Sequence, residues 1–261
     1  MAVTDFVAAS KPLKEALKSA NLLKSLKFNT LICGEPGTGR HTLARLMMPN
    51  TPIISADAPS VYDAIEKNQQ LIIDKLERLD SLSKLTQIVQ KYGTQIIGIG
   101  DMGAQGEAIS LFSVKIVLPP LHDRPEDIPP LAEKFRREVL HAFGEEEETF
   151  KVDLSKVDLS RNALSLRKSI YIQYLSEKVD SEQLLDLIEN FLSKQMDGEE
   201  NLYRKFLYLY EVPLIRAGVK KYRSQLKMSH AFGLNRNTLR KKIQEWCEFL
   251  TCVKEESQNT K

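Results

Sequence analysis

The chain has 261 residues, of which 42% are hydrophobic and 28% charged, with a formal net charge of +2. This composition excludes a wholly disordered chain and fits a folded protein with one large domain or two modest ones. No run approaches the ~18 consecutive apolar residues of a membrane span. The three scattered cysteines form no C-x-x-C pair, and no secretory signal is recognisable, so we expect no metal and a cytoplasmic protein.

The first 120 residues alternate helical and strand-like segments. Residues 12–26 have an amphipathic helical pattern, residues 29–33 are β-prone, and residues 42–48 resume a helix. Short apolar runs at 71–73, 95–99 and 114–118 are typical of buried parallel strands. The alternation predicts an α/β domain, and residues 127–194 read as mainly helical.

A glycine-rich loop, residues 34–41 (GEPGTGRH), lies between a predicted strand and a predicted helix. Phosphate-binding loops require that context, because glycines turn backbone N–H groups inward and a helix N-terminus favours an anion. Both glycines of G-x-x-x-x-G-K-[ST] are present, but Arg40 and His41 replace the lysine and the hydroxyl residue. The alternative is a glycine-rich turn that binds nothing. The candidate nucleotide-binding residues of the loop are Gly34, Glu35, Gly37, Thr38, Gly39, Arg40 and His41.

Two segments, GEPGTGRHTLARLMM and LPPLHDRPEDIPPLAEKF, resemble the NtrC-type bacterial enhancer-binding proteins, which are AAA+ regulators that act with sigma-54. The resemblance implies an AAA+ P-loop-like parallel sheet with a helical lid, and ATP or ADP as the ligand. It also implies that Asp74 assists Mg²⁺ and that Arg167 occupies the nucleotide-sensing position of the lid. For Arg167 the alternative is an ordinary surface arginine.

Several departures from this family argue against ATP hydrolysis. Lys75 replaces the glutamate that orients the attacking water, and a lysine is a poor base at neutral pH. Residues 108–111 offer no arginine for a neighbouring γ-phosphate. The sigma-54 remodelling loop, G-A-F-T-G-A, is absent. We therefore assign no catalytic residue and expect neither an enzyme nor a sigma-54 activator.

The positive charge is concentrated near the C-terminus. Residues 216–242 contain nine basic and no acidic residues, which leaves 28 basic against 35 acidic residues elsewhere, a net charge of −7. Such asymmetry is typical of nucleic-acid binding, although a solvated basic helix gives the same count.

Residues 224–246 read as two short helices and resemble the Fis-type helix-turn-helix. Gly233 can adopt the left-handed conformation that ends the first helix, and Asn235 is a good N-cap for the second. We expect Arg236, Asn237 and Arg240 to read bases, and Thr238, Lys241 and Lys242 to contact phosphates. The alternative is an amphipathic helix pair with a basic surface. The candidate DNA-binding residues are Asn235, Arg236, Asn237, Thr238, Arg240, Lys241 and Lys242.

An apolar helical segment precedes this pair, and Fis-type modules dimerise through the equivalent helices. We expect a homodimer through residues 202–222, with docking on the lid as the alternative. The predicted domains are an α/β subdomain (1–125), a helical lid (126–195), a linker (196–201), an all-α Fis-like domain (202–250) and a polar tail (251–261).

The sequence thus favours a sequence-specific regulator of transcription that binds double-stranded DNA and has a degenerate AAA+ body. Its partners could include RNA polymerase or another AAA+ regulator, and no membrane is expected. The alternative is a nucleotide-binding or weakly hydrolysing AAA+ protein that modulates another enhancer-binding protein.

Overall fold

The computed structural model describes residues 6–101, 111–145, 150–196 and 200–248. The chain folds as two compact units, Met1–Lys178 and Val179–Lys261, and each is described by itself. No helix in the described part of the chain is long and apolar enough to cross a membrane.

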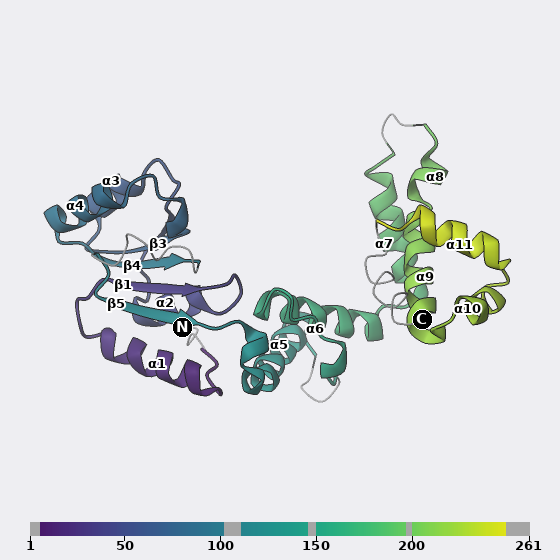
Figure 1. Cartoon of the computed structure of the whole chain (residues 1–261), viewed down its shortest axis with the longest axis horizontal. Coiled ribbons are helices and arrows are strands. Elements are labelled where there is room, and N and C mark those ends of the chain that lie inside the picture. The colour runs from purple at the N-terminus through teal and green to yellow at the C-terminus, as the bar shows by residue number, and fades with distance from the viewer. Residues whose placement is uncertain (1–5, 102–110, 146–149, 197–199, 249–261) are drawn as a thin grey trace, which may run out of the picture. The chain divides into compact units, whose positions relative to one another are not determined.

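The first unit is built on a parallel five-stranded sheet, in the order β2-β3-β4-β1-β5 (Figure 1). The strands are β1 (Thr30–Gly34), β2 (Ile53–Ser55), β3 (Gln70–Asp74), β4 (Gln95–Gly100) and β5 (Val114–Leu118). The parallel α/β fold is confirmed, and four strands lie within a residue or so of their predicted positions. The edge strand β2 was not predicted from the sequence; it has three residues and is only half-buried.

Helices cover both faces of this sheet. On one face α1 (Lys11–Leu23) and α2 (Arg40–Met47) pack against Ile32, Ile97 and Ile116. On the other, α3 (Val61–Lys67) and α4 (Leu82–Tyr92) pack against Leu31, Cys33 and Ile96. Successive residues of a strand point to opposite faces, and here both faces are buried, so the strands read as continuous apolar runs.

A small helical lid follows β5 within the same unit. Short turns at Leu121–Asp123 and Pro125–Asp127 lead into α5 (Ile128–Phe143), which packs beside α6 (Ala163–Lys178). A 3-10 turn, Leu154–Lys156, lies between the two helices.

The second unit is all-helical. It contains α7 (Ser181–Ser193), α8 (Leu202–Phe206), α9 (Tyr208–Tyr222), α10 (Gln225–Ala231) and α11 (Arg236–Glu245). The sequence analysis places α7 in the lid, whereas the structure places it in this unit, where Phe191 makes an edge-on ring contact with Phe206. Residues 196–201, predicted as an interdomain linker, follow α7 and precede α8 inside the unit; residues 197–199 of this segment lie outside the described part, as does the polar tail.

Candidate functional sites

The glycine-rich loop leaves β1, a central strand, at the carboxyl edge of the sheet. Gly37 has φ +86°, and a Cβ there would lie 2.5 Å from the carbonyl oxygen of Arg161. Gly39 has φ +107° and stands at the N-cap of α2. The backbone N–H groups of residues 39–42 have no acceptor within the described residues, so they remain available to an anion.

Beside the loop, His41 is held by Asp74. Its Nε2 lies 3.1 Å from Oδ1 of Asp74, the last residue of β3, and the two side chains are 50% and 21% exposed. Arg40 donates from Nη1 to the carbonyl oxygen of Gly100 at 2.5 Å, at the end of β4. Both substituted loop residues therefore lie along the carboxyl ends of β3 and β4. Lys75, which follows Asp74 in the chain, is exposed and adopts φ +56°.

A buried ion pair ties the lid to the loop. Arg124 is 2% exposed and Asp127 0%, and Nη1 of Arg124 lies 3.2 Å from Oδ2 of Asp127. Arg124 also donates from Nη2 to the carbonyl oxygen of Thr38 at 2.8 Å. Asp127 accepts hydrogen bonds from the backbone N–H groups of Ala9 and Ser10 and from the Ser10 hydroxyl. Burial raises the pKa of Asp127, but the bonds from Ser10, Ala9 and Arg124 outweigh it and the pKa falls below its usual value.

A second tie comes from Asn162, which the sequence analysis missed. It is buried at φ +55°, and its amide nitrogen donates to Glu35 Oε2 at 3.0 Å and to the Pro36 carbonyl at 3.1 Å. Its amide oxygen accepts from the Leu121 N–H at 2.6 Å. Asparagine tolerates the left-handed backbone region better than most residues. That preference was the only feature of the sequence that could have pointed to Asn162.

Arg167, which the resemblance puts at the nucleotide-sensing position, has its described contacts within the lid. Its guanidinium forms an ion pair with Glu138 and stacks over Tyr171, 5.1 Å from the ring centre. The bond from Arg167 to Glu138 is the main cause that raises the pKa of Arg167. The α6 side chain beside Gly37 is instead Leu164, whose Cγ would lie 3.1 Å from a Cβ at that glycine. At Gly37 the lid thus adds an apolar contact to the hydrogen bonds made by Arg124 and Asn162.

A small pocket of about 110 Å³ adjoins the loop. Its walls come from the N-terminal segment, the loop with the start of α2, and the lid helices. Most of its lining is apolar, and its polar side chains are those of Thr38, Thr42, Arg124 and Lys134. The lining residues include Phe6, Val7, Gly39, Leu131, Lys134 and Ala163.

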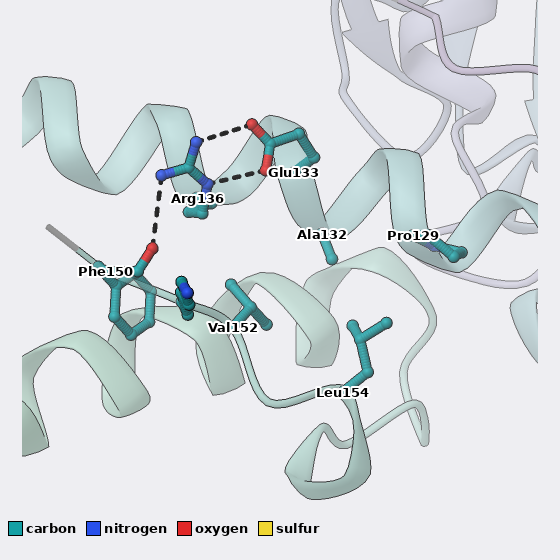
Figure 2. A pocket seen from close by; sticks show the side chains of 8 residues that line it. Pro129, Ala132, Glu133, Arg136, Phe150, Val152 and Leu154 are labelled. Atoms are coloured by element: carbon teal, nitrogen blue, oxygen red, sulfur yellow. Dashed lines mark hydrogen bonds and ion pairs between the residues drawn. The ribbon is translucent and has the colours of Figure 1, made fainter. Parts of the chain in front are cut away.

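A wider groove of about 700 Å³ lies on the lid, between α5 and the segment that follows it (Figure 2). Figure 2 shows Arg136 pointing toward Glu133 and toward the carbonyl group of Phe150. The bond from Arg136 is the largest cause that lowers the pKa of Glu133 to about 2. Glu133 and Arg136 in this groove are thus paired with each other.

In the second unit, α10 and α11 form a closely packed pair. Asn235 caps α11, since its side chain accepts from the Asn237 N–H at 2.9 Å, and Gly233 has φ +63° between the helices. Both features are as the sequence predicts. Leu239 is 1% exposed, and a Cβ at Gly218 of α9 would lie 2.5 Å from Phe232 and 2.7 Å from Met228. Only glycine permits this approach of α9 to α10.

The outer side of α11 is basic. Six of the seven candidate DNA-binding residues are exposed, namely Asn235, Arg236, Asn237, Thr238, Arg240 and Lys241. The seventh, Lys242, is instead half-buried and forms an ion pair with Glu211 of α9. Glu211 is buried and also accepts a hydrogen bond from the Trp246 indole at 2.7 Å. Lys242 thereby fixes the recognition-helix candidate to α9. The sequence spacing alone gave no sign of this contact.

Apolar side chains gather on α7, α8 and α9. They surround a groove of about 600 Å³ that includes Leu184, Ile188, Phe206, Tyr210 and Leu214. None of the α7 residues is buried, and several large ones are half or more exposed: Leu184 52%, Leu185 65%, Leu187 60% and, on α8, Tyr203 80%. Apolar surface of this kind marks an interaction site more often than a free surface.

Two comparisons by sequence, with protein-family models and with curated proteins, gave no match. Solved structures do match. NtrX from Brucella abortus in complex with ADP is 15% identical, with a TM-score of 0.58 over 93% of this chain and 69% of that chain. The same protein in complex with ATP is 16% identical, with a TM-score of 0.53 over 92% and 69%. At this identity the likeness shows the fold alone, which for the first unit is a parallel α/β sheet covered by helices.

Proposed function

We propose that the chain is a sequence-specific regulator of transcription that binds double-stranded DNA through a Fis-type helix-turn-helix formed by α10 and α11. The observation that carries this proposal is the exposed basic side of α11, set above a buried Leu239. In helix-turn-helix proteins the first residues of the second helix meet base edges in the major groove. Arg236, Asn237 and Arg240 are the side chains with the matching chemistry, because arginine pairs with guanine and asparagine with adenine.

The contacts of Lys242 refine its role in this proposal. An ammonium group held by Glu211 is not free to reach a phosphate unless that bond breaks. We therefore assign the phosphate contacts to Thr238 and Lys241, and give Lys242 the role of positioning α11 on α9.

The proposed regulator binds DNA as a homodimer. The apolar surface of α8 and α9, residues 202–222, is extended by α7, whose leucines are exposed in the single chain. Two copies that bury this surface would present two α11 helices to half-sites about one DNA turn apart.

A gel-shift titration tests the DNA proposal, with operator sequences first selected from a random duplex library. Arg236→Ala and Arg240→Ala should each relax specificity at one base position and cost about 1–3 kcal/mol. Lys241→Ala should weaken binding equally for all sequences, and the salt slope should fall by about one. Arg137→Ala, an exposed arginine of α5, is the matched control. Unchanged sequence selection by both arginine variants would refute the assignment.

A second function, nucleotide binding without turnover, is favoured by the loop. The backbone N–H groups of residues 39–42 have no acceptor within the described residues and lie beside the small pocket, which suits a phosphate group. Lys75 follows Asp74 in place of the glutamate that would orient the attacking water, so we expect binding of ATP or ADP without hydrolysis. Isothermal titration calorimetry tests binding, and phosphate release tests turnover. Turnover that is lost in Asp74→Ala would contradict the second half of this proposal.

A further inference from the structure

Asp74 and His41 meet at the point where a P-loop fold holds its metal ion. Asp74 ends β3, and His41 is the second residue of α2, directly after the glycine-rich loop. The hydroxyl residue and the carboxylate at these two positions normally share Mg²⁺. Here the imidazole Nε2 lies 3.1 Å from the carboxylate, so these groups are paired with each other.

The residues present do not fit Mg²⁺. This ion takes oxygen ligands in near-ideal octahedral geometry, and an imidazole nitrogen is a poor substitute for a hydroxyl oxygen. The next carboxylate, Glu77, accepts from the backbone N–H of Asp101 at 3.2 Å. Across the described residues no three His, Cys, Asp or Glu side chains are arranged to hold a metal ion. To enter, a cation would have to separate Asp74 from His41.

The pair also competes with a metal ion for the Asp74 carboxylate. A bare carboxylate beside a polyphosphate repels it, and Mg²⁺ normally screens that repulsion. With the His41 imidazole against it, Asp74 is already partnered. Arg40, fixed by its bond to Gly100, supplies a permanent positive charge along the same edge of the sheet.

We infer that this loop binds a nucleoside di- or triphosphate independently of Mg²⁺, with the His41–Asp74 pair occupying the metal position and Arg40 supplying the positive charge. The inference rests on the nucleotide binding proposed above. It adds that the ligand is the metal-free nucleotide, a form that cannot follow the metal-assisted hydrolytic route of related folds.

The test is isothermal titration of the full chain with ADP and with ATP, once in Mg²⁺ and once in excess EDTA. The Kd should agree between the two conditions within about threefold. His41→Thr, which installs the hydroxyl, should weaken binding in EDTA by about tenfold or more and regain it in Mg²⁺. The matched control is His122→Thr, because His122 is an exposed histidine 3.5 Å from the carboxylate of Asp123.

The outcomes separate this inference from the nucleotide proposal. Binding of the native chain in Mg²⁺ but not in EDTA would keep the nucleotide function and overturn metal independence. An absence of binding in both conditions would refute both. Circular dichroism and a thermal scan of His41→Thr show whether the variant is folded. A folded His41→Thr that binds equally well in both conditions would remove His41 from the proposed role.

Discussion

Replacing Asp127 by alanine should unfold the first unit more readily than any surface change. Arg124 is 2% exposed in the native chain, and after the substitution its guanidinium keeps its hydrogen bonds to the carbonyl groups of Pro119 and Thr38 but loses the carboxylate of Asp127. It also removes the acceptor for two backbone N–H groups, those of Ala9 and Ser10. Breaking a buried pair by removing one partner costs about 3–5 kcal/mol, because the remaining charge stays buried.

This loss of free energy of unfolding predicts a measurable change in the melting temperature. For a unit of 178 residues, 1 kcal/mol shifts the melting temperature by about 2–4 °C, so Asp127→Ala should lower it by roughly 6–20 °C. Far-ultraviolet circular dichroism follows the whole chain. The one tryptophan, Trp246, lies in the second unit, so its fluorescence reports the other transition separately.

The matched control is Asp57→Ala. Asp57 also pairs with an arginine, Arg78 at 3.3 Å, but the two side chains are 44% and 59% exposed. Exposed pairs contribute about 0–1 kcal/mol, so this variant should melt within a few degrees of the native chain. The double change Arg124→Met with Asp127→Ala should recover part of the loss, since no unpaired charge remains.

The pH dependence gives an independent check. The folded-state pKa of Asp127 lies below its usual value, so its contribution to stability is present above the pKa of the unfolded chain, ~3.9. The contribution is lost as pH falls through the lower, folded-state pKa. The difference in the free energy of unfolding between the native chain and Asp127→Ala should therefore be constant near neutral pH and should shrink as the solution becomes acidic. If Asp127→Ala lowers the melting temperature at neutral pH by no more than Asp57→Ala does, the reasoning is refuted.

Three further predictions concern the second unit. Gly218→Ala should lower the free energy of unfolding of this unit by about 1–3 kcal/mol, because the new Cβ overlaps Phe232. Urea unfolding followed by Trp246 fluorescence measures this loss. The control Ala217→Ser, at the exposed neighbouring position, should leave the free energy of unfolding unchanged. Glu211→Ala should cost about 1–3 kcal/mol by the same assay, since Lys242 and the indole lose their acceptor, and an unchanged midpoint would contradict the network. Leu185→Lys should shift sedimentation toward monomer while Ile172→Lys, equally apolar and 54% exposed on the first unit, should not; a dimer in both would move the interface elsewhere.

Most of the parallel sheet could be read from the sequence, because its strands are buried on both faces and appear as short apolar runs between helices. The ends of the strands follow from glycine and proline, and so does the place of the glycine-rich loop. The edge strand β2 could not be found this way, since three half-buried residues leave no periodic signal. Likewise Gly233 and Asn235 fixed the ends of α10 and α11, because caps depend on local backbone chemistry.

The partners of individual charged side chains depended on the tertiary structure. Nothing in sequence spacing indicates that Lys242 meets Glu211 thirty-one positions away, that Arg167 turns to Glu138, or that Asn162 holds the glycine-rich loop. The assignment of α7 to the second unit is of the same kind, because an apolar helix can pack on either neighbour in the chain. The sequence by itself determined the two kinds of module and the +9 charge of residues 216–242, since propensity, pattern and composition are local properties. Only the fold decided which charges are free to act, because long side chains find partners that are distant in sequence and close in space.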